Sequence, residues 1–232
     1  MLRAIIFDFD GIIADTEPLH FQAFADVLRS EGITFDAGDY FGTYLGLNDA
    51  TMLRQFSTDR GLNWDDAARA RIQAAKDFAY RASVSNGLPL MRGVRELIER
   101  SAGKRAMAVC SGARRVEIEA VLAQHDLTKL LSIIVSADDV LLSKPDPAGY
   151  RRAIELIAKE NGSILPSDCL AIEDSLLGVR AAKAAGLRVL HVTANGHHPS
   201  TQNRMKCERE ADWGCDGLEQ ITEDILNQWF SV

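Results

Sequence analysis

Residues 3–11, RAIIFDFDG, decide the fold, because an apolar run there ends abruptly in two carboxylates and a glycine. A short apolar run of this kind is typical of a strand that is buried on both faces of a parallel sheet. Asp8 is the last residue of the run, and Asp10 and Gly11 follow it in an expected functional loop. The stretch therefore predicts a first strand that delivers Asp8 and Asp10 to the carboxyl edge of a sheet.

Four more apolar runs follow along the chain, and a helical pattern separates each from the next. We expect strands at residues 106–111, 131–136, 169–173 and 187–192. Strands that alternate with helices form parallel sheets with helices on both faces. The predicted fold class is therefore α/β, with a doubly wound, Rossmann-like parallel sheet.

The stretch between the first strand and residue 88 breaks this alternation, because it has helical patterns but no convincing strand. We predict a small all-helical cap at residues 16–88, inserted into a core made of residues 1–15 and 89–232. Because the cap follows the first strand directly, it should lie above the carboxyl edge of the sheet, where open α/β folds bind ligands. Residues 196–217 are expected to form a polar, irregular loop before a last helix.

The composition excludes several classes of protein. The formal net charge is -7, whereas surfaces that bind nucleic acid or anionic membranes need clustered Lys and Arg. No apolar segment is long enough to span a membrane, and the four cysteines have no paired spacing typical of disulfides. We expect a monomeric, cytoplasmic protein that acts on a small metabolite and binds neither nucleic acid nor membrane.

Reactive side chains stand at the carboxyl ends of four predicted strands, which a parallel sheet would bring together. Hydrolysis of a phosphate ester needs a nucleophile, a proton donor and charge neutralisation acting jointly, because enzymes must supply up to about 10²¹-fold acceleration. The strand ends offer all three. The candidate residues are Asp8, Asp10, Ser111, Gly112, Lys144, Glu173 and Asp174.

Each of these residue types suits one part of that chemistry. Asp8 is placed to attack phosphorus and form an aspartyl-phosphate that water then cleaves. Asp10, with a raised pKa, would protonate the leaving oxygen and then activate water. Several carboxylates facing a dianionic phosphate need a divalent cation such as Mg²⁺ between them. Candidate ligands are Asp8, the carbonyl of Asp10, Asp174 and, directly or through another group, Glu173.

The motifs DFDG at 8–11, SG at 111–112, KPDP at 144–147 and IEDS at 172–175 resemble the four motifs of the haloacid dehalogenase superfamily. DTEPLH at 15–20 and the helical insert resemble its β-phosphoglucomutase and CbbY-like phosphatase subgroup. The resemblance implies a Mg²⁺-dependent phosphatase acting on a small phosphorylated metabolite, such as a sugar phosphate. It also implies that Ser111 and Lys144 bind the transferred phosphate and that Glu173 with Asp174 organises the metal.

The resemblance further points to substrate-binding residues around the cap. His20 would bridge cap and core, Gly46 is the glycine of a cap loop, and Lys76 would approach the reaction centre. Arg114 is a fourth candidate, since it follows the phosphate-binding SG motif. Each has an ordinary alternative: packing or surface exposure for His20, a solvated helix charge for Lys76, and pairing with carboxylates of its own helix for Arg114.

Three other functions stay open. In the resembling mutases a Lys precedes the cap glycine and an Arg follows it three positions later, whereas Leu45 and Asp49 stand here, so we favour hydrolysis over mutase chemistry. Phospho-receiver signalling modules carry similar groups on a doubly wound sheet, but they are about half this length and lack a cap. A catalytically silent binding protein would have no reason to carry every charged group that turnover requires.

Overall fold

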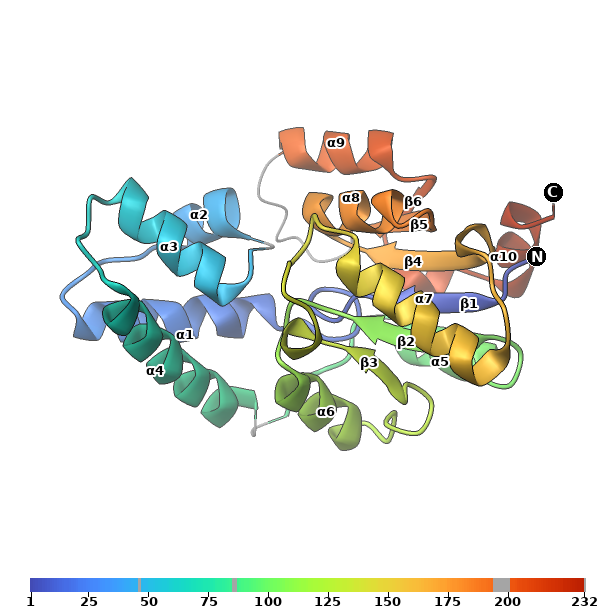
Figure 1. The fold of residues 1–232 in the computed structure, drawn as a ribbon, viewed down its shortest axis with the longest axis horizontal. Coiled ribbons are helices and arrows are strands. Elements are labelled where there is room, and N and C mark those ends of the chain that lie inside the picture. The colour runs from blue at the N-terminus through green and yellow to red at the C-terminus, as the bar shows by residue number, and fades with distance from the viewer. Residues whose placement is uncertain (46, 85–86, 194–200, 232) are drawn as a thin grey trace.

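A parallel sheet of six strands lies at the centre of the computed structural model, which describes residues 1–45, 47–84, 87–193 and 201–231. The strand order is β3-β2-β1-β4-β5-β6, so the chain reverses its direction of travel across the sheet between β1 and β4. This arrangement confirms the predicted doubly wound fold (Figure 1). The strands are β1 (Ala4–Phe7), β2 (Ala106–Cys110), β3 (Ile133–Val135), β4 (Cys169–Glu173), β5 (Arg188–Val192) and β6 (Trp213–Cys215).

The central strand β1 is buried on both sides, which explains its uninterrupted apolar sequence. Ile5 and Phe7 belong to one hydrophobic cluster, and Ala4 and Ile6 belong to a second. Alternate residues of a strand face opposite sides of a sheet, so these clusters lie on its two faces. Helices α5 (Val94–Ser101), α6 (Arg115–Gln124) and α10 (Glu223–Trp229) contribute to the first cluster, and α7 (Ala148–Asn161) and α8 (Leu176–Ala184) to the second.

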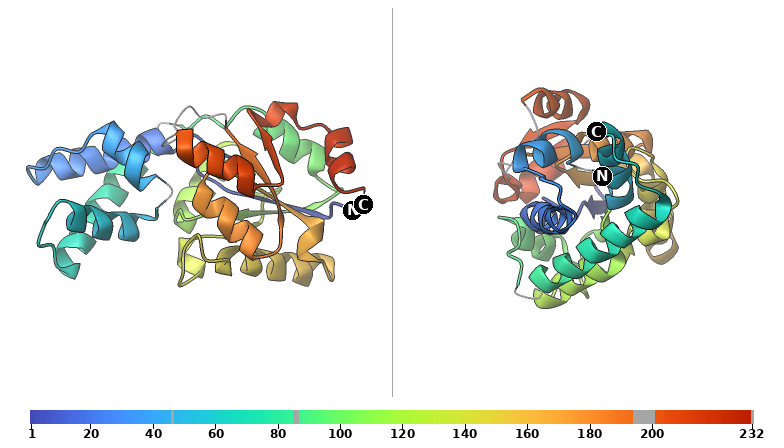
Figure 2. Two further views of the ribbon diagram at one scale, coloured as in Figure 1. Left: turned by 90° about the horizontal axis from the view of Figure 1, so that it is seen from above. Right: turned by 90° about the vertical axis from the view of Figure 1, so that its left-hand side faces the viewer.

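Between β1 and α5 the chain forms a helical insertion that lies beyond the carboxyl ends of the strands (Figures 1 and 2). Residues of this insertion form a third hydrophobic cluster, which includes Phe24, Leu53 and Phe56. The exact division into a cap at 16–88 and a core at 1–15 and 89–232 stays a prediction. The helices of the insertion are α1 (Glu17–Ser30), α2 (Ala37–Asp39), α3 (Asp49–Asp59) and α4 (Asp66–Val84), with a π-helical turn at Tyr40–Tyr44.

The expectation of an irregular loop at residues 196–217 is wrong where the structure describes it. Residues 196–200 lie outside the described segments. The rest of the stretch contains the helix α9 (Thr201–Glu210) and the strand β6. Helix α9 packs on α8 and is joined to it by an ion pair of 2.7 Å between Arg180 and Glu210. The sequence gives little sign of either element, because α9 is strongly polar and β6 is an edge strand of three residues.

The cysteines are free, as their spacing predicted. Among the described helices, none combines the length and apolar character needed to cross a bilayer. The monomeric state and the cytoplasmic location stay predictions.

Gly93, at the start of α5, provides a test of the packing between this helix and the turn at Leu218–Gln220. Its φ is +80°, and an added Cβ would lie 2.1 Å from the backbone nitrogen of Glu219. The variant Gly93→Ala should therefore lower the free energy of unfolding by about 3 kcal/mol or more.

Gly103 is the matched control, because its φ is +73° but nothing lies within 4 Å of an added Cβ. Gly103→Ala should lower the free energy of unfolding by only about 1 kcal/mol, the cost of the positive φ alone. Urea unfolding measures both losses. Equal losses in the two variants would contradict the close approach of Gly93 to Glu219.

Candidate active site

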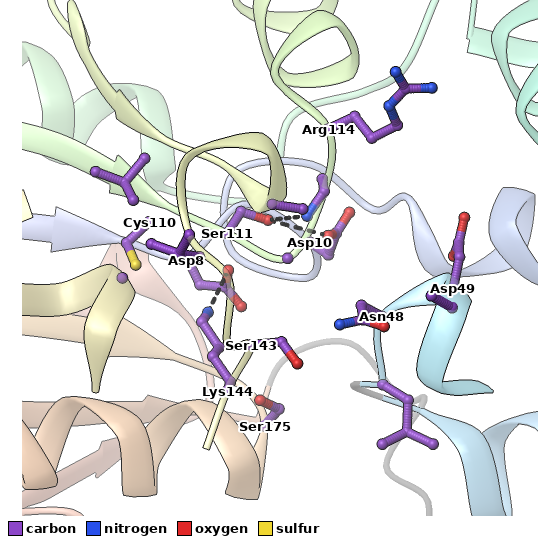
Figure 3. A pocket seen from close by; sticks show the side chains of 18 of the residues that line it. Asp8, Asp10, Asn48, Asp49, Cys110, Ser111, Arg114, Ser143, Lys144 and Ser175 are labelled. Carbon is purple, nitrogen blue, oxygen red and sulfur yellow. Dashed lines mark hydrogen bonds and ion pairs between the residues drawn. The ribbon is translucent and has the colours of Figure 1, made fainter. Parts of the chain in front are cut away.

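Asp8 lies immediately beyond β1, next to the point where the sheet reverses its strand order, and open α/β sheets bind ligands at such a point. Its backbone N–H donates to the carbonyl of Ile172 in β4 at 2.9 Å, which extends the sheet by one residue. Its Oδ1 accepts from the N–H of Phe9 at 2.8 Å and lies 2.8 Å from Nζ of Lys144. These contacts fix the carboxylate in the pocket (Figure 3).

Lys144 connects Asp8 to the end of β4. Its Nζ lies 2.6 Å from Oε1 of Glu173, a side chain with no exposed surface. The hydroxyl of Tyr150 also donates to Glu173. Gly178 is required beside this carboxylate, since an added Cβ would lie 1.9 Å from Oε2 of Glu173. The structure thus holds Glu173 in one position between a cation, a phenol and a helix.

Asp8, Glu173 and Asp174 form a set of three carboxylates suited to a hard divalent cation. One oxygen from each can be chosen so that all lie within 4.8 Å of one another. Burial, followed by the charges of neighbouring carboxylates, raises the pKa of Asp8 and of Asp174 well above the usual range. A cation between them would relieve that cost, and Mg²⁺ prefers oxygen ligands of this kind. The residues present therefore fit the predicted metal.

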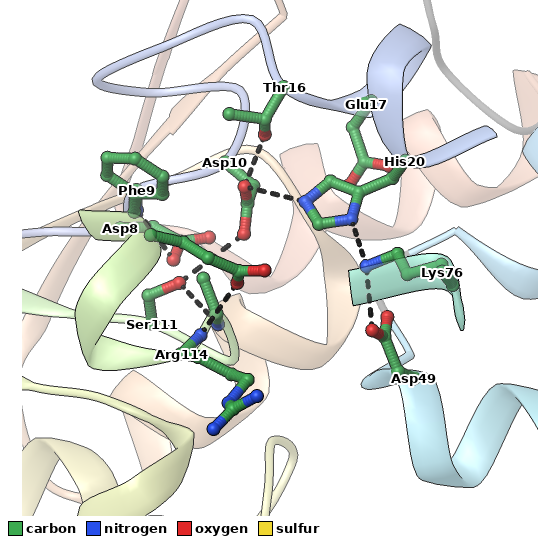
Figure 4. Close-up of polar contacts among 12 residues, drawn as sticks. Asp8, Phe9, Asp10, Thr16, Glu17, His20, Asp49, Lys76, Ser111 and Arg114 are labelled. Carbon is green, nitrogen blue, oxygen red and sulfur yellow. Dashed lines mark hydrogen bonds and ion pairs between the residues drawn. The ribbon is translucent and has the colours of Figure 1, made fainter. Parts of the chain in front are cut away.

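The side chain of Asp10 is not part of that set and points towards Thr16 and His20 (Figure 4). The hydroxyl of Thr16 donates to its Oδ1, Ser111 Oγ lies 3.4 Å from its Oδ2, and Nε2 of His20 lies 3.6 Å from its Oδ1. Burial alone would raise the pKa of Asp10, but the contacts with His20 and Thr16 and the charge of Lys76 lower it below the usual value. The expectation of a raised pKa is therefore wrong for this arrangement.

His20 and Lys76 form a buried connection from Asp10 into the cap. Nζ of Lys76 lies 2.7 Å from Nδ1 of His20 and 2.7 Å from Oδ2 of Asp49. An ammonium can only donate, so Nδ1 accepts, and the ring proton is assigned to Nε2, which faces Asp10. Lys76 has no exposed surface, so a solvated helix charge is the wrong description of it. His20 packs face to face with the ring of Tyr80, with 4.1 Å between centroids.

Arg114 lies at the edge of the pocket and pairs mainly with another element. Its Nη1 lies 2.9 Å from Oδ2 of Asp77 in α4, and its Nε lies 3.8 Å from Oδ1 of Asp138. Its side chain is 44% exposed, which leaves part of the guanidinium accessible. Ser111 and Gly112 line the pocket as well, whereas Gly46 lies outside the described residues.

The pocket between the strand ends and the helical insertion has a volume of about 340 Å³. On the cap side its lining includes polar residues, such as Glu17 and Tyr40, that the sequence did not single out as substrate contacts. Oε2 of Glu17 accepts from the hydroxyl of Tyr40 at 2.7 Å, and burial raises the pKa of Glu17 to about 7. Thr16 and Glu17 belong to the DTEPLH motif, whereas Tyr40 has no comparable sequence signal. The cap-side residues are Glu17, His20, Tyr40, Leu45, Leu47, Asn48, Asp49, Ala50 and Gln73.

Comparison with known proteins places the chain among phosphate-ester enzymes. The family model of haloacid dehalogenase-like hydrolases matches residues 5–192. The chain is 31% identical over 232 residues to protein CbbY of Rhodobacter capsulatus, covering 97% of each. It is 30% identical over 191 residues to the fructose-1-phosphate phosphatase YqaB of Escherichia coli strain K12, covering 81% of this chain and 95% of that protein.

A solved structure of a related protein is similar to this chain in both fold and sequence. It is the crystal structure of a mutant of CbbY from Rhodobacter sphaeroides in complex with xylulose-(1,5)bisphosphate, and that protein is 27% identical to this chain. The TM-score is 0.81, and the match covers 95% of this chain and 96% of that one. The similarity extends over the insertion as well as the sheet.

Calorimetric unfolding with and without Mg²⁺ tests the carboxylate set. A ligand that binds only the folded state stabilises it by about 2.7 kcal/mol at a hundred times its Kd, so Mg²⁺ should raise the Tm of the wild type. Asp174→Asn should lose most of this increase. Without Mg²⁺ the variant should unfold at no lower temperature, because it removes a charge that Asp8 and Glu173 repel.

Asp138→Asn is the control, since Asp138 lines the same pocket but does not belong to the carboxylate set. This variant should keep the increase in Tm on adding Mg²⁺. If the increase were unchanged in Asp174→Asn, the ion would bind elsewhere and the proposed ligand set would be wrong.

Proposed function

Because the chain belongs to the haloacid dehalogenase-like hydrolases, we propose that it is a Mg²⁺-dependent phosphatase that hydrolyses a phosphorylated sugar or polyol through an aspartyl-phosphate on Asp8. The observation that carries this proposal is the placement of Asp8, which Lys144 and the N–H of Phe9 hold beside Glu173 and Asp174. Bound there, Mg²⁺ would neutralise negative charge on the phosphoryl group and on the carboxylates.

In the first step, an oxygen of the Asp8 carboxylate attacks phosphorus, and the bond from phosphorus to the sugar oxygen breaks. Lys144 lies 2.8 Å from Asp8 and offsets charge on the transferred group. Ser111 and Gly112 line the same pocket and offer a hydroxyl and a backbone N–H to phosphoryl oxygens. The leaving sugar oxygen needs a proton, for which Asp10, two residues after Asp8 and in the same pocket, is the proposed acid.

In the second step, water attacks the aspartyl-phosphate, giving inorganic phosphate and restoring Asp8. Asp10 is proposed to accept the proton of that water, so the same carboxyl donates in one step and accepts in the next. Its contacts with Thr16 and His20 favour the charged form. Asp10 must carry a proton before it can donate one to the leaving group. We therefore propose that its contact with His20 loosens first, which would raise the pKa of Asp10.

The size and lining of the pocket support a sugar or polyol phosphate as substrate. A volume of about 340 Å³ is at the small end of ligand pockets and suits a small metabolite. Asn48, Gln73 and Tyr40 offer amides and a phenol to hydroxyl groups. The relatives support a phosphorylated sugar in general, since one is a fructose-1-phosphate phosphatase and a mutant of the CbbY neighbour was crystallised with xylulose-(1,5)bisphosphate. A phosphomutase of β-glucose 1-phosphate is the alternative that the sequence left open.

Release of inorganic phosphate from a panel of sugar and polyol phosphates tests the proposal. The wild type with Mg²⁺ should release phosphate from at least one of them, and chelation of the metal should stop the reaction. Asp8→Asn should lower kcat by about 10³-fold or more, because the amide cannot act as the nucleophile.

Asp26→Asn, an exposed carboxylate on α1, should keep the wild-type rate. If Asp8→Asn kept the wild-type rate, the aspartyl-phosphate route would be wrong. Formation of glucose 6-phosphate from β-glucose 1-phosphate without phosphate release would establish the mutase instead.

A further inference from the structure

The described residues that line the pocket are strongly unbalanced in charge. They include eight carboxyl groups and only two permanent cations. A small phosphorylated ligand in this pocket is therefore surrounded mainly by carboxyl groups, which accept hydrogen bonds from hydroxyls and, when charged, repel phosphate. The carboxyl groups belong to Asp8, Asp10, Glu17, Asp49, Glu117, Asp138, Asp146 and Asp174, and the cations to Arg114 and Lys144.

Both cations already have carboxylate partners. Lys144 lies between Asp8 and Glu173, at 2.8 and 2.6 Å, where the transferred phosphate is proposed to bind. Arg114 pairs with Asp77 of α4 at 2.9 Å and lies 3.8 Å from Asp138. The first phosphate has Lys144 and the metal set to neutralise it. Arg114 is the remaining cation among the described residues of the lining, and Asp77 and Asp138 offset its charge.

Asp49 is the carboxylate that stands across the pocket from the reaction centre. Figure 3 shows Asn48 and Asp49 on the opposite side from Asp8 and Lys144. The turn is fixed because Oδ1 of Asn48 accepts from the N–H of Thr51 at 2.8 Å and so caps α3. Asp49, the first residue of that helix, therefore has a defined position on the cap wall.

The two oxygens of Asp49 have different surroundings. Oδ2 lies 2.7 Å from Nζ of Lys76, which is fully buried and does not line the pocket. Oδ1 accepts no hydrogen bond from any described residue, and the side chain is 21% exposed. The ammonium of Lys76 thus pairs with Asp49 from outside the pocket, and Asp49, which lines the pocket, keeps one oxygen without a hydrogen bond from the described residues.

We infer that Asp49 determines specificity: Oδ1 accepts a hydrogen bond from a hydroxyl of the substrate, and its charge rejects a second phosphate, so the enzyme takes monophosphates of sugars or polyols and discriminates against bisphosphates. This inference rests on the proposed phosphatase function. Like charges placed opposite each other are a general means of excluding a wrong ligand. Asn48 and Gln73 add neutral groups that suit further hydroxyls.

Fructose 1-phosphate and fructose 1,6-bisphosphate form the matched pair for the test, because they differ only in the second phosphate. With Mg²⁺ the wild type should have a kcat/KM for the monophosphate at least about 100-fold higher than for the bisphosphate. The difference should lie mainly in KM, since Asp49 does not touch the reacting atoms. Equal values for the two substrates, or a preference for the bisphosphate, would overturn the inference.

Asp49→Asn keeps the size of the side chain and removes its charge, while Lys76 keeps its contact with His20 at 2.7 Å. The preference for the monophosphate should fall by about 10-fold or more, because Lys76 is then free to attract the second phosphate. Asp49→Glu should keep the preference. Asp66→Asn, whose side chain is fully exposed on α4, is the matched control and should also keep it.

Glu17→Gln provides an independent variant in case Asp49→Asn fails to fold. Gln can still accept from the hydroxyl of Tyr40, and removing this second carboxyl should also reduce the preference. The assay pH should lie above 7, so that Glu17, with a pKa of about 7, carries its charge in the wild type. An unchanged preference in both Asp49→Asn and Glu17→Gln would contradict a role for the cap carboxylates.

Binding to Asp8→Asn, measured by calorimetry with Mg²⁺, separates this inference from the proposed function. The variant lacks the nucleophile, so both ligands should stay intact during the measurement. A Kd at least about 100-fold higher for the bisphosphate supports the inference, and equal values or no binding of either ligand overturn it. Absence of phosphate release from every substrate by the wild type would overturn the phosphatase function instead, whatever the two Kd values are.

Discussion

Mutual repulsion among Asp8, Glu173 and Asp174 is the constraint on which the other features of this site depend. Two like charges 4 Å apart repel by about 4 kcal/mol at an effective dielectric constant of 20, and these carboxylates offer oxygens within 4.8 Å of one another. They meet because β1 and β4 are neighbours and both end at the same edge of the sheet. Lys144 offsets part of the repulsion, and the raised pKa values of Asp8 and Asp174 indicate the part that remains for a metal ion.

A buried charge in the cap, Lys76, also contacts the polar residues of the site. Lys76 is buried among His20, Asp49 and the rings of Phe24 and Tyr80, whose centroids lie 5.2 and 4.9 Å from its Nζ. The charge of this ammonium helps to lower the pKa of Asp10. The same ammonium forms an ion pair with Asp49 on the cap side of the pocket. One buried cation thus links the proposed acid and base to the surface that the rest of the substrate would touch.

Sequence was sufficient for five of the six strands and for the polar residues at their carboxyl ends, because each of these strands and its terminal polar residues lie within one short segment. Cys169–Glu173 was predicted as a strand with the observed bounds. The cap side was harder, since the contact between Lys76 and His20 spans 56 positions and the helical pattern RIQAAKDF suits a solvated charge equally well. The polar α9 and the three-residue β6 carry too weak a pattern to be recognised. A raised pKa was expected for Asp10 from its proposed role as an acid, and the contacts with His20 and Thr16 that lower this pKa join residues whose side chains the sequence did not place together.

The complete burial of Lys76 also limits how this protein can diverge. A charge without exposed surface tolerates the loss of its partner poorly, so a change at Asp49 alone leaves a buried ammonium with a single hydrogen-bonded neighbour, His20. Substitutions at positions 49 and 76 are therefore expected to become fixed together in descendants of this sequence. Ligand preference in such a lineage would change when both positions change together, while the four strand-end motifs stay the same.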